Sequence, residues 1–120
     1  MSIFSRIFGK KNDEYSPKFR IEFAKRLDKK PIKYVSERDE DGSETILGKA
    51  GCLYTSGEVL RVVSTSGKIF EGRIVDLHMS ELMSGDGVII HGPDLMNEGR
   101  IRKLVAYYTY YSKPVRADFN

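Results

Sequence analysis

Residues 58–75 read EVLRVVSTSGKIFEGRIV, and this stretch decides the fold. Two runs rich in β-branched residues, 58–63 and 69–75, flank the turn residues Thr65, Ser66 and Gly67, which is the pattern of a β-hairpin. Gly72 interrupts the second run, and a glycine inside a strand marks strong curvature or the close approach of another backbone. The stretch therefore predicts a bent antiparallel hairpin.

The same period of two continues on both sides of this hairpin. Glycines 48 and 51 indicate a bend or bulge upstream, whereas 76–84 is compatible with either a helical turn or an irregular crossover. No strand–helix–strand alternation is present. We expect strands at 32–35, 45–47, 53–54, 58–63, 69–75, 88–90 and 101–111, the last being the longest. The prediction is a mainly β protein, a small strongly bent antiparallel sheet or barrel of six to seven strands.

An N-terminal α-helix precedes the strands. Ser16 and Pro17 suit the cap and the first position of a helix, and Pro31 stops it. The apolar stripe of this helix consists of Phe19, Phe23, Ala24 and Leu27. We divide the chain into an amphipathic, basic extension (1–15), the helix (16–30), a single β domain (31–113) and a polar tail (114–120).

Composition limits the class of protein. The 120 residues make one domain, 31% charged and 40% hydrophobic, which is ordinary for a folded chain. Of its charges, residues 1–30 hold nine Lys/Arg and four Asp/Glu, whereas the remainder holds eleven and thirteen, so a basic head precedes a slightly acidic body. With one cysteine, Cys52, no disulfide within the chain, and no secretory signal, we expect a cytoplasmic protein.

Chemistry-bearing residues form no catalytic or metal-binding motif. His78 and His91 lack the spacing of a metal site, and Asp76, Asp86 and Asp94 read as turn residues that bond the local backbone. No glycine loop has the Gly and Lys spacing that wraps a phosphate. We therefore expect a protein that is not an enzyme and has no cofactor and no metal.

Tyrosines dominate the end of the last strand and follow a short basic segment. Rings on a strand beside cations stack with unpaired bases, whereas an aromatic edge strand also pairs with another chain. Because the body is slightly acidic, we favour self-association over single-stranded RNA binding. The candidate interaction surface is Arg100, Arg102, Lys103, Tyr107, Tyr108, Tyr110 and Tyr111.

The basic head has three interpretations. It is a solvated helix face with a loose tail, an anchor on an anionic membrane surface, or a segment that docks on a partner protein. For the membrane version, apolar side chains insert and cations meet lipid head groups. The candidate contacts are Ile3, Phe4, Arg6, Ile7, Phe8, Lys10 and Lys11.

Two resemblances extend this interpretation. Gly72-Arg73-Ile74-Val75-Asp76-Leu77-His78-Met79-Ser80 resembles the first motif of Sm-like RNA-binding barrels, a likeness that implies base-contacting positions at His78 and Ser80. The stretches 81–92 and 105–111 look like those of a family of small uncharacterised proteins from Gram-positive bacteria with no assigned activity, which implies a bacterial origin.

The function predicted from the sequence is a non-catalytic binding or scaffold domain that self-associates into a homo-oligomer or binds a protein partner. Two alternatives stay open: binding of single-stranded RNA through the tyrosine-rich strand, and peripheral membrane attachment through residues 1–11.

Overall fold

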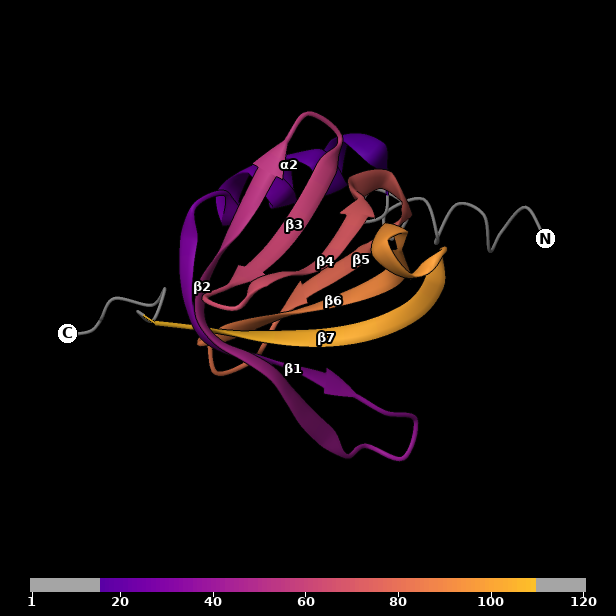
Figure 1. Cartoon of the computed structure of the whole chain (residues 1–120). Helices are drawn as coiled ribbons and strands as arrows, with labels where there is room; N and C mark the ends of the chain where they lie inside the picture. Colours follow the sequence, from indigo (N-terminus) through magenta and orange to yellow (C-terminus); the bar gives the residue numbers. More distant parts are fainter. Residues whose placement is uncertain (1–15, 110–120) are drawn as a thin grey trace, which may run out of the picture.

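Within residues 16–109, the fold consists of one seven-stranded antiparallel sheet and one α-helix (Figure 1). The computed structural model describes residues 16–109. Its elements are α2 (Pro17–Leu27), β1 (Lys30–Arg38), β2 (Glu44–Ser56), β3 (Val59–Ser64), β4 (Gly67–Arg73), a 3₁₀ turn η1 (Ile74–Asp76), β5 (His78–Glu81), β6 (Gly87–Asp94), a 3₁₀ turn η2 (Leu95–Asn97) and β7 (Arg100–Tyr108). The predicted mainly β class, strand number and N-terminal helix are confirmed.

The sheet is strongly curved, but no strand ladder closes it. Its strand order is β4-β3-β2-β1-β7-β6-β5, so β4 and β5 are the edges although they follow one another along the chain. Every ladder in it is antiparallel. Of the two predicted forms, a bent sheet or a barrel, the described residues form an open, curled sheet.

Helix α2 covers one end of the curled sheet. Ser16 caps it by accepting a hydrogen bond from the Phe19 N–H at 3.1 Å, as the sequence indicates. Phe23, Ala24 and Leu27 are its buried residues and join the core formed by the strands. Within residues 16–109, no helix is long and apolar enough to cross a membrane.

The helix ends three residues earlier than predicted. Asp28, the C-cap, is extended, and Lys29 takes a left-handed conformation with φ 66°. Strand β2 causes this early end, because the Lys29 N–H donates to the Leu53 carbonyl and the Asp28 carboxylate accepts from the Thr55 N–H. The following strand therefore starts at Lys30, one residue before the proline that was expected to stop the helix.

Other boundaries also differ from the prediction. Residues 76–84, for which the sequence left two alternatives, hold the end of η1 and strand β5. The last strand ends at Tyr108, and the longest is β2, with 13 residues.

The β1–β2 ladder continues across the predicted bend from Arg38–Glu44 to Lys30–Leu53, with a register shift between Val35 and Ser36. A bulge thus bends this hairpin without ending it.

The core lies between the concave face of the sheet and α2. Strand β3 alternates half-buried and buried residues along its length, which confirms the period of two that predicts this hairpin. Leu77 lies over Gly72 and Gly92, where a Cβ atom would come within 2.9 and 2.7 Å of its Cδ2. The curvature predicted at Gly72 therefore accommodates a core leucine.

Gly51 marks the closest approach of two strands. A Cβ at this position would lie 1.9 Å from the carbonyl oxygen of Val63 on β3, a separation that only a backbone shift relieves. Its neighbour Ala50 has φ 53°, a left-handed conformation that costs an L-residue about 1–2 kcal/mol. Gly51 thus has no room for a side chain, whereas the backbone of Ala50 has a conformation that favours glycine.

We predict opposite effects on the free energy of unfolding for single substitutions at Gly51 and Ala50. Gly51→Ala is expected to lower the free energy of unfolding by about 1–3 kcal/mol or more, because it overpacks β2 against β3. Ala50→Gly is expected to leave this free energy unchanged or raise it by up to about 1 kcal/mol, because it relieves the left-handed strain. Urea denaturation of both variants measures the difference; a Gly51→Ala protein as stable as the parent contradicts the close approach.

Candidate functional site

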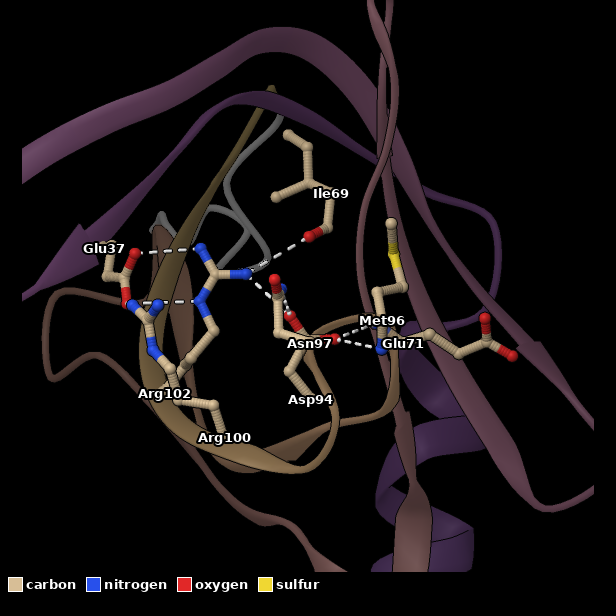
Figure 2. Close-up of polar contacts among 8 residues, drawn as sticks. All are labelled: Glu37, Ile69, Glu71, Asp94, Met96, Asn97, Arg100 and Arg102. Carbon is tan, nitrogen blue, oxygen red and sulfur yellow. Dashed lines mark hydrogen bonds and ion pairs between the residues drawn. The ribbon is translucent and has the colours of Figure 1, made fainter.

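A buried ion-pair network joins β7 to β6 and β1. The Arg102 guanidinium donates from Nη1 to Asp94 Oδ2 at 2.7 Å, from Nη2 to Glu37 Oε1 at 2.8 Å and from Nε to Glu37 Oε2 at 3.1 Å (Figure 2). Asp94 is fully buried, and the Arg102 side chain is 9% exposed. A single arginine therefore holds two carboxylates, one of them with paired parallel hydrogen bonds.

The same network reaches β4, the edge strand on the far side of the curl. Asp94 Oδ1 accepts from the Glu71 N–H at 3.2 Å and from the Met96 N–H at 3.0 Å, and Asp94 Oδ2 accepts from Asn97 Nδ2 at 2.6 Å. Arg102 Nη1 also donates to the Ile69 carbonyl at 3.4 Å. Side chains from β6 and β7 thus satisfy backbone groups of β4 where no ladder exists, and we call this the Asp94 clasp (Figure 2).

Both acids of the clasp are held in the charged form. Hydrogen bonds from Arg102 lower the pKa of Glu37 below its ordinary value. For Asp94, burial acts to raise the pKa, but the hydrogen bonds from Arg102, Asn97 and two backbone N–H groups outweigh it and lower the pKa. With its donors directed at these partners, Arg102 is a structural residue in this fold.

Beside the clasp, β1 and β7 separate and leave a groove. Their ladder ends at the pair Glu37–Leu104, although β7 begins four residues earlier, at Arg100. The β1–β2 hairpin projects away from β7 at this point (Figure 1). The groove has a volume of about 510 Å³ and is lined by Glu37, Arg38, Asp39, Glu40, Asp41, Arg100, Ile101, Arg102 and Lys103.

The two walls of the groove carry opposite charges. Asp39, Glu40 and Asp41, all exposed, lie on the hairpin wall, and Arg100 and Lys103 lie on the β7 wall. The Arg100 side chain is 65% exposed and only loosely paired with Glu37, at 3.4 Å. Ile101, 60% exposed, lies between these cations in the sequence of β7. The groove thus combines an apolar anchor with charges of both signs.

The hairpin wall is a preformed turn. The Asp39 N–H donates to the Ser43 carbonyl at 2.8 Å, and the Gly42 N–H donates to the Asp39 carbonyl at 3.0 Å. The Asp41 carboxylate accepts from the Ser43 N–H and hydroxyl, which lowers its pKa. The acidic residues at the tip are therefore held in place by the turn itself.

The tyrosines of the predicted interaction surface are not equivalent. Tyr108 is fully buried, and its hydroxyl donates to Glu81 at 3.2 Å, so its predicted place on a surface is wrong. Tyr107, half-buried on the opposite face, lies 4.6 Å from the Tyr34 ring and donates to Glu44 at 3.1 Å. Tyr110 and Tyr111 lie outside the described residues. The RNA-binding alternative stays a prediction.

The basic residues predicted for that surface also divide. All three line the groove, but the Arg102 guanidinium is bound within the clasp. The membrane-contact residues predicted between 1 and 11 all lie outside the described part of the chain, so that prediction stays open.

His78 and His91 face one another across β5 and β6, with ring centroids 6.5 Å apart. Burial lowers the pKa of His91, and the neighbouring charges of Lys103 and His78 lower it further. No group of three or more His, Cys, Asp or Glu that would hold a metal ion exists among residues 16–109. Ser80, which the Sm-like resemblance marks with His78, lies on β5 as well; the resemblance itself stays a prediction.

Sequence reasoning missed the acidic half of the site. Asp94 was interpreted as a turn residue, which is correct for its bond to the Met96 N–H, but its contacts with Arg102 and Glu71 depend on how the sheet curls. Glu37 and the run Asp39–Asp41 are not among the site residues predicted from the sequence. The signal present in the sequence is that acidic run at a hairpin tip, opposite in charge to the segment 100–103.

Comparison of the chain with family models, curated proteins and solved structures gives no match.

We predict that Asp94→Asn lowers the free energy of unfolding by about 3–5 kcal/mol, because it removes one charge of a buried pair. The control Lys68→Gln breaks an exposed pair with Glu71 on β4 and is expected to cost less than about 1 kcal/mol. Urea denaturation at neutral pH measures both. An equal, small effect of the two substitutions contradicts a structural role for the clasp.

The clasp also predicts a dependence of stability on pH. Because folding lowers the pKa of Asp94 and Glu37, their contribution is complete above the ordinary carboxyl values of about 4 and is lost as pH falls through the lower folded values. We expect the urea midpoint of the parent protein to decrease over that range. Asp94→Asn should decrease less steeply, and parallel curves for the two proteins contradict the assignment.

Proposed function

We propose that this protein is a non-catalytic binding or scaffold domain that takes up an extended segment of a protein partner in the groove between the β1–β2 hairpin and β7. The observation that carries the proposal is the end of the β1–β7 ladder at Glu37–Leu104. Beyond it, Arg100–Lys103 are paired with β6 alone, so one edge of this part of β7 faces the groove.

An exposed strand edge binds extended peptides by adding a strand, in which main-chain hydrogen bonds give affinity and side-chain pockets give specificity. The groove is wide and open to solvent, so a bound segment would lie along it and stay partly exposed. Ile101 on the β7 wall is 60% exposed, and a bound segment that covers it would remove apolar surface from water.

The charges of the two walls indicate which charges a bound segment would carry. Acidic side chains of the bound segment would face Arg100 and Lys103, and basic side chains would face Asp39 and Glu40. Since Glu37 and Arg102 neutralise one another at the inner end, the charges on the walls govern selection.

The test uses a synthetic library of short peptides, each with one apolar residue between an acidic and a basic residue. We expect binding peptides to shift the amide NMR signals of Arg38–Asp41 and Arg100–Lys103. Ile101→Asp should weaken this binding by about tenfold or more, because it removes the apolar contact.

The control is Met83→Asp, which makes the same kind of change at a large, fully exposed apolar side chain in the β5–β6 turn, outside the groove. This variant should bind as the parent does. A library that shifts none of the groove amides, or equal weakening by both variants, contradicts the proposed function.

A further inference from the structure

The acidic hairpin and the basic start of β7 attract one another but remain unpaired across the groove. Among residues 16–109, Asp39 and Asp41 accept hydrogen bonds from the Ser43 side chain, and none of Asp39, Glu40 and Asp41 forms an ion pair. On the opposite wall, Arg100 has only its loose contact with Glu37, and no described carboxylate lies in an ion pair with Lys103. Each wall therefore displays charge that is not neutralised within the described chain.

We propose that the partner at this groove is a second copy of the chain, whose acidic hairpin tip, Asp39–Ser43, packs as a closed turn against the basic β7 wall, so that two copies exchange tips in a two-fold dimer. This inference rests on the proposed function and names its partner. A surface with walls of opposite charge is complementary to itself under a two-fold axis, because each acidic wall then meets the basic wall of the other copy. A surface of one sign would repel its own copy.

The shape of the hairpin suits this exchange. The tip projects beyond β7 (Figure 1) and is held by its own backbone hydrogen bonds, so it does not have to become ordered on binding. Tip and receiving groove lie next to one another, which allows both contacts of a two-fold pair to form at once.

An exposed apolar side chain of the groove adds a contact that does not depend on charge. Ile101 lines the groove and is 60% exposed. Exposed large apolar residues that border a groove mark a surface for a protein partner. The dimer is thus expected to combine an apolar centre with salt-sensitive charged contacts.

The decisive experiment reverses the charge of each wall separately. The acidic-wall variant carries Asp39→Lys and Glu40→Lys, and the basic-wall variant carries Arg100→Glu and Lys103→Glu. By analytical ultracentrifugation at low salt, the parent is expected to be a dimer that dissociates at high salt, and each variant alone a monomer. Mixing the two variants should give a one-to-one complex, and combining all four substitutions in one chain should restore the homodimer.

A mixture that restores association cannot arise from misfolding, so these rescues keep the test valid even if one variant alone is unstable. A second control, Lys103→Glu alone, leaves the Arg100–Glu37 contact in place and should weaken the dimer in the same direction.

Three results overturn the inference: a parent that stays monomeric at low salt, a dimer that neither variant weakens, or variants that fail to associate when mixed. If the library peptides still shift the groove amides in such a case, the proposed function stands and only the identity of the partner is wrong. If the peptides also leave the groove amides unshifted, both the proposed function and the dimer are wrong.

Discussion

The contact on which the rest of the structure depends is the buried pair between Asp94 and Arg102. An open antiparallel sheet leaves two edges, and this one curls until β4 approaches the end of β6 without a ladder between them. The Asp94 carboxylate bonds the Glu71 N–H, and the Arg102 guanidinium bonds the Ile69 carbonyl, so two side chains satisfy backbone groups that a closed barrel would pair between strands. The β4 edge is thereby bonded at Ile69 and Glu71.

Curvature of this degree requires small residues at the points of closest approach. Gly72 and Gly92 leave room for Leu77, and Gly51 lets β2 approach β3. The curl then brings β4 within reach of Asp94, so the glycines and the clasp depend on one another. A charge as deeply buried as that of Asp94 is tolerated only with a full set of partners, and the described residues give it four.

The alternation in residues 58–75 is sufficient to predict β3 and β4, because a period of two with a turn between the runs has one interpretation. Tyr108 could not be placed in the same way. Both faces of its strand carry rings, so only the register with β1 and β6 decides that Ala106 and Tyr108 face the core and Tyr107 does not. For the same reason the sequence predicts Asp94 as a turn residue but not its pairing with Arg102. Properties that one segment determines are predictable; those that need three strands in register are not.

The groove follows from the same geometry. The register shift between Val35 and Ser36 marks a bulge, and a bulge increases strand twist and bends the hairpin away from its neighbour. Two residues further on, the ladder with β7 ends at Glu37, whose carboxylate Arg102 holds against the clasp. The clasp therefore anchors β1 at the point where the hairpin departs, and it neutralises the inner end of the groove. The acidic tip and the basic start of β7 remain charged and line the groove together. Among the described residues, the start of β7 thus has an edge without a ladder partner, as do the outer strands β4 and β5.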